Sequence, residues 1–152
     1  MTPQAQLAGF LGKFSPEVAA LGRSALAKLR SRFPTANRLV YDNYNALAIG
    51  FVPSERPLDA VFSVAVFAGG VNLCFLQCGP ELADPGKLLR GTGRKCRHVR
   101  LESAEMLDDP CVTALLAEAT LRATMPFPTT GRGKWIVRAV STRQRPRRPA
   151  RK

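Results

Sequence analysis

The chain has 152 residues, of which 23 are basic and 11 acidic, so its formal net charge is +12. A chain of this length is expected to form one domain that buries a hydrophobic core without the help of a metal ion or disulfide bonds. No stretch approaches the roughly eighteen apolar residues of a membrane-spanning helix, and no apolar run follows a charged start as it does in a signal peptide. With four cysteines that we expect to be free thiols, these features favour a cytoplasmic protein and argue against a membrane protein.

The positive charge is concentrated in two segments. Residues 87–100 carry six basic side chains and residues 128–152 carry nine, and neither segment contains an acidic residue. The rest of the chain is close to neutral, so any attraction to phosphate groups should be confined to these segments. The simpler interpretation is that both are solvated charge runs.

Three helices are predicted from apolar periodicity and start signals. An i, i+3, i+4, i+7 apolar stripe within residues 1–14 indicates a short amphipathic helix. A second helix begins at residues 15–17, SPE, which supply an N-cap serine, a proline at the first helical position and an acid in the first turn, and it ends before Pro34. A third begins in the same way at Asp109 and Pro110.

Between and after these helices the apolar period changes to two, which is typical of strands. Strands are predicted over 38–44, 47–51, 59–67, 71–77 and 96–101, with a late edge strand over 135–140. Short turns between consecutive strands imply antiparallel pairing, and helices before and after the run of strands imply an α+β fold. We therefore predict an antiparallel five- to six-stranded sheet packed against N-terminal and C-terminal helices.

The predicted domain covers residues 1–140, with its core at about 15–140, and residues 141–152 form a basic tail. The end of the chain, 143–152, reads RQRPRRPARK and has no hydrophobic period, so it is predicted to be disordered. Because a disordered segment buries nothing, its removal is expected to leave the thermal midpoint nearly unchanged.

Four segments carry a resemblance to a known family. They are LVYDNYNALAIGF at 39–51, VNLCFL at 71–76, LLRGTGRKCRHVRLES at 88–103 and GRGKWIVRAVSTRQRPRR at 131–148. In this order they resemble the YdhG-like domain family, a family of undefined function, over about residues 15–148. The resemblance implies a small α+β domain with an antiparallel sheet packed on helices, together with the suggestion of a frataxin-like role in iron handling. It carries no active-site residue onto this chain.

The first candidate site is the glycine turn at 91–93 and the strand that follows it. Glycines let backbone N–H groups converge on an anion, and Arg94 and Lys95 would add positive charge. The turn matches neither a P-loop nor a dinucleotide fingerprint, and the simpler interpretation is a turn with solvated cations. A similar loop, GRGK at 131–134, precedes the last predicted strand, and similar turn requirements explain the likeness.

The strand after this turn carries His98, the only histidine of the chain. Positive charge on Arg97 and Arg100 would favour the neutral imidazole, which suits a ligand or a general base, although a hydrogen-bonded structural histidine is the simpler interpretation. The polar run around Tyr41 and Tyr44 could form the floor of a pocket with His98, or simply a turn with Asx hydrogen bonds. The predicted ligand-binding residues are Arg94, Lys95, Arg97, His98, Arg100, Tyr41 and Tyr44.

Two sets of side chains are candidate metal ligands. The zinc candidates are Cys74, Cys78, Cys96 and His98, whose spacing does not match the usual CxxC knuckle, so buried thiols are the simpler interpretation. The iron candidates are the acidic cluster Glu102, Glu105, Asp108 and Asp109. Acids at helix starts, where the helix dipole favours them, are the simpler interpretation of this cluster. No cofactor is predicted.

These observations favour a non-enzymatic binding module that takes a small anionic ligand at the 91–100 loop and strand. No paired carboxylates, nucleophile–base pair or metal set indicates an enzyme. Two alternatives stay open: a nucleic-acid-associated accessory protein that acts through the tail, and a frataxin-like iron chaperone. Binding through the tail would be non-specific and weakened by salt.

Overall fold

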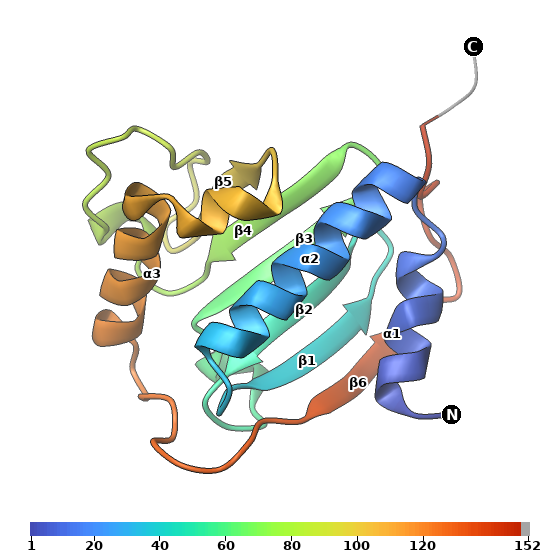
Figure 1. The fold of residues 1–152 in the computed structure, drawn as a ribbon, viewed down its shortest axis with the longest axis horizontal. Coiled ribbons are helices and arrows are strands. Elements are labelled where there is room, and N and C mark those ends of the chain that lie inside the picture. Colours follow the sequence, from blue (N-terminus) through green and yellow to red (C-terminus); the bar gives the residue numbers. More distant parts are fainter. Residues whose placement is uncertain (150–152) are drawn as a thin grey trace.

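The structure is a computed structural model and describes residues 1–149. Its helices are α1 (Pro3–Leu11), α2 (Pro16–Arg32) and α3 (Pro110–Arg122). Its strands are β1 (Asn37–Asp42), β2 (Leu47–Val52), β3 (Phe62–Phe67), β4 (Gly70–Phe75), β5 (Arg97–Leu101) and β6 (Trp135–Val140). This arrangement confirms the predicted α+β class (Figure 1). Within the described range, no helix is both long and apolar enough to cross a membrane.

The helices begin where their capping residues predict. Ser15 Oγ accepts a hydrogen bond from the backbone N–H of Val18 at the start of α2, and Asp109 Oδ1 accepts one from Cys111 at the start of α3. Each cap satisfies a backbone N–H that has no partner within the helix. Both caps are followed by a proline at the first helical position.

The six strands form one sheet in the order β5-β4-β3-β2-β1-β6. The four pairs between β1 and β5 are antiparallel, as the short connections predict. The last pair differs from the prediction, because β6 runs parallel to β1, so the sheet is mixed. The cause is the long connection through α3 and residues 123–134, which returns the chain to the end of the sheet where β1 begins.

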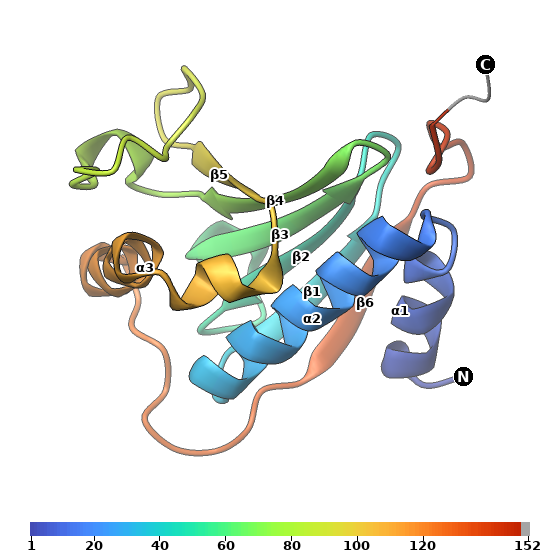
Figure 2. The same cartoon turned by 45° about the horizontal axis from the view of Figure 1, so that its top comes forward.

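All three helices lie on one side of the sheet, with α2 crossing its middle, α1 beside β6 and α3 at the β5 end (Figure 2). The core lies between these layers. Its central row consists of the cross-strand partners Val40, Ile49, Val64, Leu73 and Val99, all of which are buried. Alternation along the strands places a different row on the opposite face, made of Leu39, Gly50, Ser63, Cys74 and His98.

The basic tail differs from the expectation of disorder as far as Arg148. The backbone N–H of Arg145 donates to Tyr44 O (2.9 Å), and the Arg147 side chain is only 6% exposed. Arg147 Nη2 donates to Asp42 Oδ1 (3.1 Å). Because Asp42 lies 105 residues away along the chain, no local pattern in the tail could have indicated this anchor. Residues 150–152 of the predicted tail lie outside the described residues.

Candidate functional site

The predicted anion loop is an exposed turn that precedes β5. A backbone bridge holds it, in which Arg90 N–H donates to His98 O (2.8 Å) and His98 N–H donates to Arg90 O (3.0 Å). Gly91 has a φ of 111°, so it is this glycine, and not Gly93, whose conformation disfavours a side chain. The side chains of Arg94 and Lys95 are exposed.

Two of the predicted ligand-binding arginines are engaged by the protein itself. Arg97 Nη1 donates to the carbonyl oxygens of Gly93 and Cys96. Arg100 Nη2 donates to Gly69 O (2.7 Å), and its Nε lies 3.6 Å from a carboxylate oxygen of Glu102. These contacts fasten the loop and strand to their neighbours, so the two side chains have a structural explanation.

The predicted aromatic floor beside His98 does not form. His98 in β5 pairs with Cys74 in β4, whereas Tyr41 lies on β1, and β4, β3 and β2 separate the two residues. At the usual spacing of strands this separation is about 19 Å. Tyr44 lies in the turn after β1 and packs on the guanidinium of Arg145, 5.7 Å from its ring centre.

Neither metal hypothesis is supported by the positions of its side chains. Within residues 1–149, no three His, Cys, Asp or Glu side chains lie close enough to hold a metal ion. In the proposed iron cluster, Asp108 forms ion pairs with Lys28 and Arg32, while Asp109 caps α3. The hydrogen bond from Lys28, with the nearby charge of Arg32, lowers the pKa of Asp108. Nearness in sequence therefore did not bring these carboxylates together.

The thiols differ in their expected reactivity. Burial raises the pKa of Cys74 to about 11, although a hydrogen bond with Ser63 opposes this shift, whereas Cys96 is exposed. At pH 8 about one Cys74 side chain in a thousand would be a thiolate, the form that reacts. We therefore expect iodoacetamide to alkylate Cys96 well before Cys74, as measured by peptide mass spectrometry over time. Equal rates at the two positions would contradict this placement.

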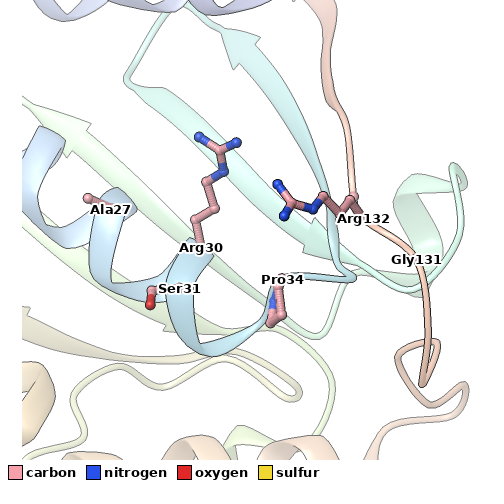
Figure 3. A pocket seen from close by; sticks show the side chains of 7 residues that line it. Ala27, Arg30, Ser31, Pro34, Gly131 and Arg132 are labelled. Atoms are coloured by element: carbon pink, nitrogen blue, oxygen red, sulfur yellow. The ribbon is translucent and has the colours of Figure 1, made fainter.

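A cavity of about 520 Å³ lies between α2 and the loop that leads into β6 (Figure 3). Its lining residues are Ala27, Arg30, Ser31, Pro34, Gly131, Arg132 and Gly133. The side chains of Arg30 and Arg132 extend into the same space from these two elements. Within residues 1–149, neither has a carboxylate within ion-pair distance. Two positively charged side chains therefore share this cavity without a carboxylate to neutralise them.

A third arginine lies behind the cavity wall. Arg38 is 1% exposed, and its Nη2 donates to Gly133 O (3.0 Å). Its Cζ lies 4.4 Å from the ring centre of Trp135, and Arg30 Cζ lies 6.0 Å from the same ring. Burial, together with the charge of Arg30, lowers the pKa of Arg38 to about 10. Burial is the larger cause of this shift in pKa, and the charge of Arg30 adds to it.

Two buried donors of this region also have no acceptor. Arg38 Nε and Trp135 Nε1 are buried without a hydrogen-bond partner in the described part of the chain. Buried donors usually find a partner, because leaving one unpaired costs about 1–3 kcal/mol. Neither residue lines the cavity, so these two donors lie in the protein layer behind it.

The glycines of the 131–134 loop make this arrangement possible. Gly131 has a φ of 91°, in the left-handed region. A Cβ on Gly133 would lie 1.7 Å from Ala36 O, so only glycine lets the loop approach the start of β1 this closely. The loop's likeness to the 91–94 turn was visible in the sequence. No pattern in the sequence indicated that this loop lies beside Arg30, because a basic residue on the exposed face of a helix needs no special explanation.

Comparison with protein-family models, with curated proteins and with solved structures found no match for this chain. The resemblance to the YdhG-like family therefore stays a prediction.

Proposed function

We propose that the protein is an anion-binding module whose site is the Arg30–Arg132 cavity. The observation that supports this is the convergence of two guanidinium groups, from α2 and from the loop before β6, without a carboxylate to neutralise them. The sequence favoured the same class of ligand, a small anion, but at the 91–100 segment. We place the site at the Arg30–Arg132 cavity instead. That segment fastens Arg97 and Arg100 to its own backbone and to Gly69.

The chemistry of the cavity suits a phosphate or carboxylate group. A guanidinium presents a planar fork of N–H donors that matches two oxygens of such a group, and two forks can hold one anion from two sides. The volume of about 520 Å³ falls within the range of small-molecule sites. Ser31 is the one lining hydroxyl, and the lining includes no histidine or carboxylate that could activate it. These features favour binding over catalysis.

Bound anion should stabilise the fold, since it would link α2 to the segment that leads into β6. Inorganic phosphate or phenyl phosphate at about 100 times its Kd is expected to add about 2.7 kcal/mol, which raises the thermal midpoint by several degrees. The double variant Arg30→Gln and Arg132→Gln should lose this response. Its midpoint without ligand should stay close to that of the wild type, because exposed cations contribute little to stability. Differential scanning calorimetry measures both quantities.

The matched control is the double variant Arg94→Gln and Lys95→Gln, which removes the same formal charge from the loop before β5. It should respond to phosphate as the wild type does. A control variant that loses the response, with an Arg30/Arg132 variant that keeps it, would return the site to the 91–100 segment. A wild type that neither phosphate nor phenyl phosphate stabilises would refute the proposed function.

A further inference from the structure

One continuous segment, residues 132–148, forms the edge of the sheet on the β6 side. Strand β6 is the last in the sheet order, and backbone hydrogen bonds extend its pairing at both ends. Gly133 N–H donates to Pro34 O (2.8 Å) before the strand, and Ser141 N–H donates to Asp42 O (2.8 Å) after it. Arg145 then donates to Tyr44 O. The segment therefore runs as a ribbon along β1 and the turn that follows it.

This ribbon carries a row of exposed positive charges, which we call the basic margin. Its members are Arg132, Lys134, Arg138, Arg143, Arg145 and Arg148. No acidic residue occurs within 128–152. The closest acidic contact made by any member is that of Lys134 Nζ, 3.9 Å from Glu55 Oε2, and both side chains are largely exposed. The members extend from the loop before β6, through the strand, to the segment that passes the turn after β1, so the charges are spread along this edge and not gathered at a point.

A line of cations fits a ligand that carries a line of anions. A small anion could contact only one or two of these charges at a time, and of the members only Arg132 also lines the cavity. A membrane surface would call for apolar side chains beside the charges, and within 132–148 Val140 is the only exposed large hydrophobic residue. Beside the margin, the half-exposed ring of Tyr44 packs on Arg145 and offers a surface on which a base could stack.

We propose that the basic margin binds the phosphate backbone of a nucleic-acid strand, one phosphate of which occupies the Arg30–Arg132 cavity. The inference rests on the proposed function, because Arg132 belongs to both the cavity and the margin. Recognition is through phosphates, so binding depends on salt and little on sequence. A second explanation for the charges is that they keep an edge strand from pairing with other chains, and that role needs no ligand.

The test is fluorescence anisotropy with a labelled mixed-sequence 20-mer, single-stranded and duplex, between 50 and 200 mM NaCl. Six phosphate contacts predict a slope of log K against log salt of about −4 for the single strand and about −5 for the duplex. The variant Arg143→Gln, Arg145→Gln and Arg148→Gln should make this slope shallower by about 2 to 3 and weaken binding at 50 mM salt at least tenfold. Arg148 Nε also donates to Lys13 O (3.3 Å), a contact that the triple variant loses. The variant Lys134→Gln and Arg138→Gln leaves this contact in place and should make the slope shallower by about 1.5 to 2.

The matched control is the triple variant Arg90→Gln, Arg94→Gln and Lys95→Gln, whose side chains are exposed before β5. It has the same net charge as the tail variant and should bind like the wild type. If both triple variants weaken oligonucleotide binding equally, net charge alone explains the effect and the inference is overturned. So would tighter binding to phosphatidylserine vesicles or polyglutamate than to the oligonucleotide at the same salt.

The two proposals can fail separately. Phosphate-induced stabilisation without oligonucleotide binding at 50 mM salt would refute the basic margin and leave the anion site standing. Oligonucleotide binding that is unchanged in the Arg30→Gln and Arg132→Gln variant would refute the role given to the cavity in holding a phosphate of the strand. Loss of binding in that variant, with normal folding, supports the two together.

Discussion

Replacing Gly133 with alanine should lower the free energy of unfolding by about 3 kcal/mol or more, a drop of about 10 °C in the thermal midpoint. The added Cβ would lie 1.7 Å from Ala36 O and 2.9 Å from Asn37 N, and these are backbone atoms that cannot rotate away. The loop would have to move outward. That movement breaks the hydrogen bond of Gly133 N–H to Pro34 O and the one that Arg38 Nη2 donates to Gly133 O.

Thermal and urea unfolding of the variant measure this loss, with two other glycines as controls. Gly9 lies within α1, and a methyl group added there would have nothing within 4 Å, so Gly9→Ala should raise stability by about 0.5–1 kcal/mol. Gly93→Ala meets only ordinary contacts, the nearest at 3.5 Å, and should be close to neutral. A Gly133→Ala protein with the wild-type midpoint would show that the loop does not approach β1 as described.

Replacing Asp42 with alanine should cost about 3–5 kcal/mol, because it leaves a buried charge without its partner. The Asp42 side chain is fully buried, with Oδ1 3.1 Å from Arg147 Nη2 and Oδ2 2.8 Å from Lys13 Nζ. Arg147 is itself buried, and its Cζ lies 5.3 Å from the ring centre of Phe14. Without the carboxylate, the charge of this guanidinium is left with only the carbonyl oxygen of Asn43 as a partner, or Arg147 and the tail leave their place together.

A double-mutant cycle with Arg147→Ala separates the ion pair from other effects of each change. The coupling free energy between the two sites, from urea unfolding, should be well above the roughly 0.5 kcal/mol typical of independent positions. Arg143→Ala, at an exposed position of the same segment, should change stability by less than about 0.5 kcal/mol. A cost below about 1 kcal/mol for Asp42→Ala would instead agree with the sequence-based expectation that the tail adds nothing.

The parts of the fold that local chemistry controls could be predicted from the sequence. Ser15 and Asp109 cap helices where they were expected to, because a cap is decided within a few residues. The 135–140 segment was recognised as an edge strand by its composition. Its direction was not, since a strand reached through a helix and a long connection can pair either way.

The candidate site and the docked tail could not be predicted, because both depend on contacts between distant parts of the chain. Arg38 and Gly133 are 95 residues apart, and Asp42 and Arg147 are 105 apart. Taken alone, Arg30 belongs on a solvated helix face, and the tail has the composition of a disordered segment. Periodicity and motif spacing report on neighbours in sequence, so they carried no sign of these pairs.

The parallel pairing of β6 with β1 also has a consequence for the order in which the protein is made. Strand β1 leaves the ribosome well before its outer partner, because β1 spans Asn37–Asp42 and β6 spans Trp135–Val140. Contacts of such long sequence separation form slowly, and domains generally begin to fold during synthesis. The backbone N–H and C=O groups on the outer edge of β1 therefore have no strand partner until residues 135–140 have been made. During that interval the nascent chain exposes an edge that can pair with other chains, and the docking of β6 closes it.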